Sequence, residues 1–348
     1  MDFFDNHLKE NESLFQDEMA LDPEYMPKMM RFRENEQKQI ADTIKPLLKK
    51  RTATNLFITG SPGIGKTLAI RHILRELEEK GLDEEIFLVY VNCWKKETAH
   101  KIVLDICNQL DYRFTINKTT DQLITEISKI MNTKSAVIIL DEIDKGESNA
   151  FSVIYSLIED IYRKSVILIT NEKNFLAEID QRIYSRLTPE TIEFRPYTKE
   201  ETYSILKERK EYAFAKGVFH EQALEIISKK AYEKNDLRIG LFLLRESGNI
   251  AERKLKKMID IEDAEQAVKK IQEYQIKNDL TEEQKKLIEL IKQKKETTTI
   301  ELHSLFDKTL SYRTFQRKLK TLEKGKLICL REENLGESKK TWVSPVNS

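Results

Sequence analysis

The chain has 348 residues, in which 59 Lys and Arg balance 59 Asp and Glu, so its formal net charge is zero. This length predicts two or three domains, and the charge balance excludes a global positive field, so any nucleic-acid site must be local. The three Cys and five His are dispersed, which argues against a disulfide framework and a zinc site. We expect reduced, mostly buried thiols, no signal peptide and no membrane span, and therefore a cytoplasmic protein.

Periodicity divides the chain into four stretches. Residues 1–20 are acidic and weakly patterned, so we expect a flexible arm that packs only in part. Residues 21–196 alternate strand and helix patterns, which predicts an α/β core with a parallel sheet covered on both faces. Residues 197–277 have helical patterns that begin with a capping box at Thr198–Glu201, and residues 278–348 form a further domain.

A glycine-rich segment, Gly60–Thr67, lies between the apolar run Asn55–Thr59 and the helical pattern Leu68–Leu77. Strand, loop and helix together predict a phosphate-binding loop, whose backbone N–H groups and helix N-terminus face a polyphosphate. Lys66 is expected to reach the outer phosphates and Thr67 to hold magnesium. The alternative is a glycine-rich turn without a ligand. The predicted nucleotide-binding residues here are Gly60, Ser61, Pro62, Gly63, Ile64, Gly65, Lys66 and Thr67.

Two acidic residues follow another apolar run, Ala136–Leu140. The run is too continuous for a strand with one buried face, so it predicts a central parallel strand. We expect Asp141 to hold Mg²⁺ and Glu142 to polarise the attacking water, which is a catalytic role. Taken alone, such residues are more often the cap and first turn of a helix. The phosphate loop favours the nucleotide site.

A third buried run, Ser165–Thr170, ends at Asn171. In P-loop ATPases with an additional strand between the phosphate loop and the acidic strand, a polar residue at this point can touch the γ-phosphate and the water. Asn171 is therefore a candidate sensor and catalytic residue. The alternative is a simple turn, because Asn is a good turn former.

The last stretch, residues 278–348, has the element order of a winged helix, with three helices followed by two strands around a polar hairpin. In helix-turn-helix proteins, the second helix of the motif enters the major groove of DNA and presents side chains near its N-terminus. The pattern therefore predicts a DNA-binding domain. The expected helices are 281–291, 299–306 and 311–323, and the expected strands are 325–331 and 339–343.

The helix at 311–323 combines a core face with a basic face. Phe315, Leu319 and Leu322 have core spacing, and Glu323 is the single acidic residue of the helix. Arg and Gln suit base edges, and Lys suits phosphate. The alternative is an ordinary solvated helix face. The candidate DNA-contacting residues of this helix and the hairpin are Tyr312, Arg313, Gln316, Arg317, Lys320, Lys339 and Lys340.

In their order and spacing, these motifs resemble the AAA+ ATPases of the cellular replication-initiator family, the archaeal relatives of the largest origin-recognition subunit and of the cell-division-cycle helicase loader. The likeness runs from about Leu14 to the end of the chain. Besides the phosphate loop and the acidic strand, the segments that carry it are Tyr25–Gln37, Val91–Cys93 with Thr98, Ile169–Leu176, Asp180–Leu187 and Asn235–Arg245.

The resemblance implies roles for residues outside the phosphate loop. Tyr25 and Arg33 would contribute to nucleotide binding, and residues 197–277 would be the lid domain of an AAA+ protein. Arg238 would reach from this lid to the γ-phosphate, as a catalytic residue that senses the bound nucleotide. The alternative for Arg238 is a surface arginine paired with a glutamate.

The arginine-bearing segment offers two candidates for an arginine finger, which acts on the phosphate bound by a neighbouring subunit. Arg186 matches the Ser-Arg dipeptide common in the family and is the preferred finger, with Arg182 as a structural partner. The chain departs from the family at Ile64, where threonine is usual, and at Asn235, where glycine is usual. Neither departure changes a group that contacts phosphate, so they concern the hydrolysis rate more than binding.

The resemblance implies an ATP-dependent, DNA-binding replication initiator that recognises origin DNA and helps recruit or load the ring helicase. Its cofactors would be ATP or ADP with Mg²⁺, and its ATP hydrolysis would be slow. Its partners would be double-stranded origin DNA, the replicative helicase and paralogous subunits or further copies on DNA, with no membrane partner. It would be cytoplasmic and DNA-associated, or nuclear in a eukaryote. The alternatives are a DNA-binding regulator that holds ADP permanently, and a clamp-loader or transposition ATPase.

A second DNA-contacting element is less well supported by the sequence. Family members carry an initiator-specific insertion after the second ATPase strand, and residues 110–126 occupy that place. Arg113 and Lys118 are candidates for contacts with backbone phosphates, but exposed loop charges are the favoured interpretation.

Overall fold

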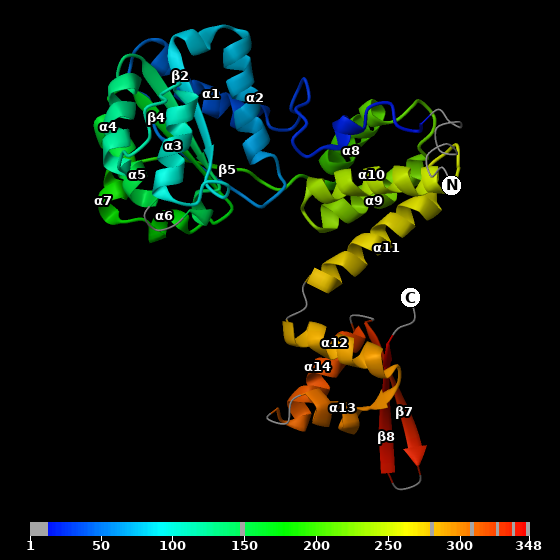
Figure 1. Cartoon of the computed structure of the whole chain (residues 1–348). Helices are drawn as coiled ribbons and strands as arrows, with labels where there is room; N and C mark the ends of the chain where they lie inside the picture. The colour runs from blue at the N-terminus through cyan, green and yellow to red at the C-terminus, as the bar shows by residue number, and fades with distance from the viewer. Residues whose placement is uncertain are drawn as a thin grey trace, which may run out of the picture. The chain divides into compact units, whose positions relative to one another are not determined.

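The computed structural model describes residues 13–146, 150–278, 282–306, 310–324, 327–335 and 338–345. The chain divides into two compact units, Met1–Gln266 and Ala267–Ser348 (Figure 1). The two units divide between Gln266 and Ala267, within helix α11 (Ile261–Asn278). The domain border expected from the sequence, between residues 277 and 278, falls at the end of the same helix. None of the described helices combines the length and the apolar character needed to cross a membrane.

A five-stranded sheet forms the centre of the first unit, in the order β2-β3-β4-β1-β5. The strands are β1 Leu56–Thr59, β2 Ile86–Asn92, β3 Ser135–Asp141, β4 Lys164–Thr170 and β5 Glu190–Glu193. All neighbouring strands pair in parallel, as the alternating pattern predicts. Every residue of β3 is buried and the strand has a neighbour on each side, which explains its continuous apolar run.

Helices cover both faces of this sheet, because successive strand residues point to opposite sides. They are α1 Glu34–Leu48, α2 Lys66–Glu79, α3 Ala99–Gln109, α4 Thr120–Met131, α5 Ala150–Asp160, α6 Phe175–Glu178 and α7 Gln181–Leu187. Ile138 of β3 packs in a core with α3, α4, α5 and α7, while Ile139 packs with α1 and α2. All three cysteines are free thiols, with Cys93 and Cys107 buried and Cys329 exposed.

Three helices after the sheet form a helical domain, and the first of them begins at the predicted capping box of Thr198. They are α8 Lys199–Ala213, α9 Glu221–Glu233 and α10 Leu237–Arg253. Helix α10 approaches its neighbours closely at two glycines. A Cβ at Gly240 would lie 2.6 Å from a methyl group of Leu206. At Gly248 a Cβ would lie 2.4 Å from the ring of Phe15, so a larger residue would separate these surfaces.

The segment expected to be a flexible arm packs against this helical domain from residue 13 onward. The ring centroids of Phe15 and Phe214 lie 4.7 Å apart. Arg209 of α8 is buried and donates to the carbonyl oxygens of Ala20 and Tyr25 at 3.1 and 3.0 Å. Burial of its apolar residues stabilises this otherwise acidic segment. Residues 1–12 of the expected arm lie outside the described residues.

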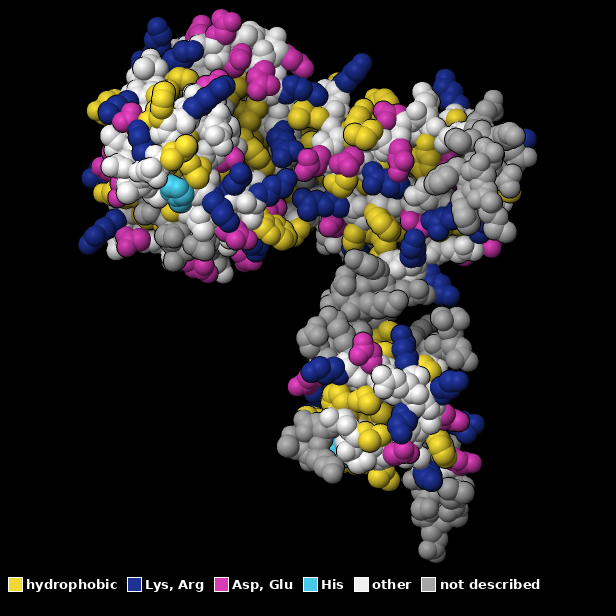
Figure 2. All heavy atoms as spheres, viewed as in Figure 1, with side chains coloured by type: hydrophobic (Ala, Val, Ile, Leu, Met, Phe, Trp, Pro, Cys, Tyr) yellow, Lys and Arg dark blue, Asp and Glu magenta, His cyan; other side chains and the backbone are white. Residues whose placement is uncertain are grey.

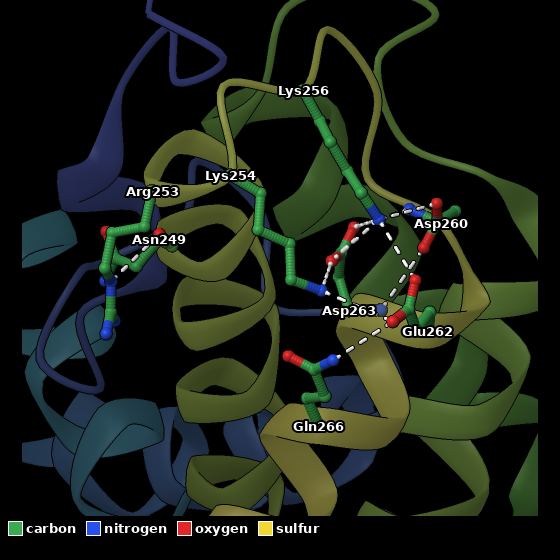
Figure 3. Close-up of polar contacts among 8 residues, drawn as sticks. All are labelled: Asn249, Arg253, Lys254, Lys256, Asp260, Glu262, Asp263 and Gln266. Carbon is green, nitrogen blue, oxygen red and sulfur yellow. Dashed lines mark hydrogen bonds and ion pairs between the residues drawn. The ribbon is translucent and has the colours of Figure 1, made fainter.

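An ion-pair network closes the turn between α10 and α11 (Figure 3). The buried carboxylate of Asp263 accepts from Lys254 Nζ at 2.8 Å and from Lys256 Nζ at 3.0 Å. Lys256 also donates to Asp260 at 2.8 Å. Asp260 and Asp263 each accept from the backbone N–H of the other, at 3.2 and 3.3 Å. These contacts fix the start of α11.

The second unit has the helix–strand–helix–helix–hairpin order of a winged helix, with an antiparallel sheet in the order β6-β8-β7. Its elements are α12 Glu282–Lys294, β6 Thr297–Thr298, α13 Thr299–Phe306, α14 Tyr312–Lys324, β7 Ile328–Leu335 and β8 Ser338–Pro345. Phe315, Leu319 and Leu322 of α14 are buried, as their spacing predicts. They pack with Leu302 of α13 and Val343 of β8 in one core.

Candidate functional site

The glycine-rich loop connects β1 to α2, and its backbone conformation requires glycine. Gly63 and Gly65 have φ angles of 72° and 89°, in the left-handed region that disfavours side chains. A Cβ at Gly63 would lie 1.9 Å from a carboxylate oxygen of Asp236. The backbone N–H of Leu237 donates to the Gly63 carbonyl at 3.4 Å. The loop is therefore so close to the start of α10 that there is no space for a side chain at Gly63.

Lys66 is the first residue of α2, and its side chain is almost fully buried. Its ammonium donates to the carbonyl oxygens of Gly60 and Ser61 at 2.7 and 2.8 Å, and to Asn171 Oδ1 at 2.8 Å. Burial lowers the pKa of Lys66 to about 8, although the negative charge of Asp141 opposes this shift. The lysine thus connects the loop to the end of β4.

Asp141 ends β3, and both of its carboxylate oxygens accept hydrogen bonds. Oδ2 accepts from Thr67 Oγ1 and from the Tyr90 hydroxyl, each at 2.7 Å. Oδ1 accepts from the backbone N–H of Glu142 at 2.9 Å. Glu142 follows in the left-handed region with a φ of 54°. Its pKa is raised, first by burial and then by the charge of Asp141.

Thr67 and Asp141 present oxygen atoms at one point, and oxygen is the ligand that Mg²⁺ prefers. Mg²⁺ is usually bound by one or two carboxylates together with substrate phosphates rather than by a cage of protein ligands. In the part of the chain that the structure describes, no group of three or more His, Cys, Asp or Glu could hold a metal ion. The residues present therefore fit Mg²⁺ that binds together with a nucleotide.

A second pair of polar contacts lies beside Asn171. Thr170 Oγ1 donates to Asp144 Oδ1 at 2.6 Å, and Lys145 pairs with Asp144 Oδ2 at 2.7 Å. Burial alone would raise the pKa of Asp144, but the hydrogen bonds from Lys145 and Thr170 outweigh it and lower this pKa. The ends of β3 and β4 are therefore tied together next to the Lys66 ammonium.

A cavity of about 1050 Å³ lies over the phosphate loop, a volume suited to a small-molecule ligand. The N-terminal segment, the sheet edge and the helical domain all contribute to its lining. The predicted residues that it brings together are Pro62, Gly63, Gly65, Lys66, Thr67, Asp141, Glu142, Asn171 and Arg238. Further lining residues, for which the sequence pattern predicted no role, include Met29, Arg71, Tyr90, Trp94 and Arg209.

Of these unpredicted residues, Tyr90 could have been inferred from its position in the sequence. It lies on β2 two residues before Asn92, so the two side chains share one face of the strand, and both line the cavity. Trp94 follows the strand and is 60% exposed at the cavity. Arg71 and Arg209 lie on helices, where arginine is a common residue, so nothing in the sequence pattern marked them as cavity residues, and the burial of Arg209 became apparent only in the fold.

Arg238 lies in the first turn of α10, where Asp236 is the N-cap and accepts from the Arg238 backbone N–H at 2.9 Å. The side chain is exposed and faces the cavity. Asn235, at the position where the family usually has glycine, has a φ of 50°. Asparagine tolerates this left-handed conformation, so the departure preserves the backbone.

Tyr25 and Arg33 do not line the cavity. Arg33 is fully buried behind the phosphate loop, where Nε and Nη2 donate to the Ile64 carbonyl at 3.3 and 3.1 Å. Its guanidinium lies 4.0 Å from the ring centroid of Tyr197. Tyr25 lies against the guanidinium of Arg209, with 4.8 Å to its ring centroid. Tyr25 and Arg33 therefore contact other protein residues near the cavity and do not contribute to its lining.

Arg186 and Arg182 lie exposed on α7, and neither lines the cavity of its own chain. Arg186 Nε pairs with Glu159 of α5 at 3.1 Å. Arg182 has its backbone N–H bonded to the Asp180 carboxylate at 2.7 Å. The two candidates for the finger differ in that Arg186 is part of an ion pair between helices.

In the second unit, four of the predicted DNA-contacting residues line a surface groove of about 440 Å³: Arg313, Gln316, Arg317 and Lys320. The Tyr312 hydroxyl is hydrogen-bonded to Thr299 Oγ1 at 2.8 Å. Lys340 Nζ lies 5.3 Å from the ring centroid of Trp342, and the side chain of Lys339 lies outside the described residues. Elsewhere basic and acidic side chains are interspersed on the visible surface (Figure 2).

The insertion expected at residues 110–126 is a loop followed by the first half of α4. Arg113 is exposed, 3.7 Å from Asp111. Lys118 donates to the Tyr112 hydroxyl and lies 5.0 Å from the centroid of that ring. The basic residues of the loop are therefore engaged within the loop itself.

Comparison with known proteins first defines the class. A model of the AAA domain matches residues 49–175, and a model of the Cdc6 AAA+ ATPase-type lid domain matches residues 203–269. The fold is shared with the Aeropyrum pernix ORC1 protein solved in complex with DNA, at 24% identity and a TM-score of 0.71 over 97% of this chain and 94% of that one. Cdc6p from Pyrobaculum aerophilum has 19% identity and a TM-score of 0.68 over 96% and 94%. The chain is an AAA+ protein with a Cdc6-type lid.

Two relatives define the family more closely. ORC1-type DNA replication protein 1 of Archaeoglobus fulgidus is 32% identical over an alignment of 283 residues, and the match covers 78% of this chain and 69% of the relative. The ORC1-type DNA replication protein of Desulfurococcus amylolyticus is 31% identical over an alignment of 317 residues, and the match covers 84% of this chain and 79% of the relative. The chain belongs to the family of ORC1-type DNA replication proteins. The predicted replication-initiator family is therefore confirmed.

Proposed function

We propose that this protein is an ATP-dependent, DNA-binding replication initiator that recognises double-stranded origin DNA and helps recruit or load the replicative helicase. One observation carries the proposal: the chain joins a cavity over a phosphate loop to a separate unit whose α14 gathers basic residues in a surface groove. A solved protein of the same fold is an ORC1 protein in complex with DNA, which supports DNA as the partner.

In the nucleotide site, the phosphate-loop N–H groups and the Lys66 ammonium would bind the phosphates of ATP or ADP. Thr67 and Asp141 would hold Mg²⁺, which neutralises phosphate charge when bound. The Glu142 carboxylate, with its raised pKa, would orient and polarise the attacking water. Asn171, which accepts a hydrogen bond from the Lys66 ammonium, would respond to the outer phosphate.

Two arginines would complete this site. Arg238 reaches the cavity from the lid, so nucleotide contact there would couple the bound phosphate to the position of α10. Arg186 lies outside its own cavity, and we infer that it serves as the finger for a neighbouring subunit, either a paralogue or a second copy on DNA. Hydrolysis by an isolated chain would then be slow.

For DNA, α14 would enter the major groove and the β7–β8 hairpin would lie along the backbone. We assign Arg313 and Gln316 mainly to base edges, because their side chains offer the hydrogen bonds that suit these edges. Arg317, Lys320 and the hairpin lysines Lys339 and Lys340 are assigned to phosphates. Tyr312 begins the helix beside them.

The test measures duplex binding at matched salt, with candidate origin sites and scrambled duplexes of equal length. Arg313→Ala should cost about 1–3 kcal/mol on the origin site and reduce discrimination, whereas Lys320→Ala should weaken both duplexes and lower the salt dependence. Lys292→Ala, an exposed lysine of α12 outside the groove, is the matched control. A chain ending at residue 277 should keep nucleotide binding and lose most specific DNA affinity.

If that shortened chain holds an origin site as tightly as the full chain, the second unit does not read DNA. Helicase recruitment is tested separately, by capture of the replicative helicase of the same organism on origin-bound protein with ATP. Intact DNA binding without nucleotide turnover or helicase capture would favour a regulator that holds ADP permanently.

A further inference from the structure

Tyr90 of β2 lines the nucleotide cavity. Its hydroxyl donates to Asp141 Oδ2 at 2.7 Å, and the same oxygen accepts from Thr67 Oγ1 at 2.7 Å. The other oxygen, Oδ1, accepts from the backbone N–H of Glu142 at 2.9 Å. The Asp141 carboxylate is thus held by donors from β2, from α2 and from the residue that follows it.

The Tyr90 ring has a partner of its own. The guanidinium of Arg71 on α2 lies 5.0 Å from the ring centroid of Tyr90. Arg71 also pairs with Glu24 of the N-terminal segment, at 3.6 Å. Glu24, Arg71 and Tyr90 all line the cavity, so a continuous chain of contacts runs from the N-terminal segment to the Asp141 carboxylate.

We propose that Tyr90 is a positioning residue, whose hydroxyl keeps Asp141 in the orientation in which Asp141 and Thr67 hold Mg²⁺. This inference rests on the proposed function, because it requires the magnesium site described above. Outer hydrogen bonds orient metal ligands, and their loss typically lowers metal affinity about 10- to 100-fold. Since Thr67 and Glu142 still donate to Asp141 in the absence of the Tyr90 hydroxyl, we expect the lower end of this range.

The test uses Tyr90→Phe in the full chain, which keeps the ring and removes only the hydroxyl. Binding of a fluorescent ADP is measured in EDTA and during a Mg²⁺ titration. The Mg²⁺ midpoint should rise about 10-fold while the affinity in EDTA stays unchanged. Tyr112→Phe also removes a hydroxyl that has a hydrogen-bond partner, but outside the cavity, and should behave as wild type.

Arg71→Met is a second variant, which keeps an apolar stem against the Tyr90 ring and removes the guanidinium. It should raise the Mg²⁺ midpoint in the same direction but by less than Tyr90→Phe. If circular dichroism shows that Tyr90→Phe is unfolded, an unchanged midpoint in Arg71→Met overturns the inference. An equal loss of affinity with and without Mg²⁺ in Tyr90→Phe also overturns it, since that result indicates a general packing role.

The variant Asp141→Asn distinguishes a failure of the role of Tyr90 from a failure of the proposed magnesium site. If Asp141→Asn removes the Mg²⁺ response and Tyr90→Phe matches wild type, the role of Tyr90 is wrong and the magnesium site stands. If the wild-type affinity does not respond to Mg²⁺, or if Asp141→Asn responds as wild type does, the magnesium site is wrong and the inference fails with it.

Discussion

Lys66 shows how burial sets the chemistry of a single residue. Its ammonium is enclosed by carbonyl oxygens and Asn171, and burial lowers its pKa to about 8, with Asp141 opposing the shift. The unfolded chain, with an ordinary lysine pKa of 10.5, therefore binds more protons between these two values. The contribution of Lys66 to the free energy of unfolding rises with pH across that window.

The same shift predicts proton uptake when a nucleotide binds. Phosphate favours the charged ammonium, so at a pH of about 8.5 the neutral fraction of Lys66 must be protonated on binding. Nucleotide affinity should fall as the pH rises above about 8. Calorimetry in two buffers with different ionisation enthalpies measures the uptake. Glu142→Gln is the control and should leave it in place; identical apparent enthalpies in both buffers would contradict the prediction.

Glu142 should separate nucleotide binding from hydrolysis. Glu142→Gln removes the carboxylate but leaves Lys66, Thr67 and Asp141 unchanged. We expect nucleotide affinity within about twofold of wild type and turnover reduced by on the order of 10²-fold or more, because general-base groups contribute on that scale. Fluorescent-nucleotide titration and phosphate release measure the two quantities. Because burial raises the pKa of Glu142, wild-type turnover should fall on acidification at a higher pH than an ordinary glutamate would cause. Full turnover in Glu142→Gln would mean that another residue polarises the attacking water.

At the scale of elements, the turn from α10 into α11 depends on one buried carboxylate. Asp263 accepts from Lys254, Lys256 and the Asp260 backbone, and Asp263→Asn would leave both ammonium groups without it. Removing one partner from a buried ion pair costs about 3–5 kcal/mol. Because the two lysine side chains are 31% and 26% exposed, we expect about 2 kcal/mol here.

Urea unfolding of the full chain, followed by circular dichroism, measures this loss. Glu262→Gln is the matched control, because Glu262 reaches the same two lysines at 3.8 and 3.6 Å but is 67% exposed. It should cost less than about 0.5 kcal/mol. Equal destabilisation by the two variants would mean that burial of Asp263 is not what matters.

For the whole molecule, the proposed role of Arg186 as a finger would make turnover a property of an assembly. An arginine finger contributes on the order of 10³-fold or more in other phosphoryl-transfer enzymes. Arg186→Ala should leave the slow turnover of the isolated chain unchanged and remove any acceleration that appears as subunits assemble on DNA. Turnover measured against protein concentration, with and without DNA, tests this. Arg182→Ala is the matched control on the same helix, and loss of the acceleration in Arg182→Ala alone would identify Arg182 as the finger.

Local sequence patterns predicted those parts of the site that depend on neighbouring residues. A glycine-rich loop between strand and helix, and acidic residues directly after a buried strand, depend on residues adjacent in the chain. Parallel strands end at one edge of the sheet, so Lys66, Asp141 and Asn171 meet there once the strands form. The same local periodicity identified the core face of α14, where Phe315 and Leu319 are buried.

Contacts between segments that lie far apart in the sequence depend on how the whole fold packs. Arg33 belongs to a motif associated with nucleotide binding, yet it is buried behind the loop and bonded to the Ile64 carbonyl. The N-terminal segment, which was expected to pack only in part, packs on the helical domain from residue 13 onward, with Phe15 against Phe214. Tyr90 reaches Asp141 from another strand. The local sequence pattern determines which face of a strand or helix a side chain lies on. Its contact partner depends on how the elements pack against one another, and that packing is set by the whole fold.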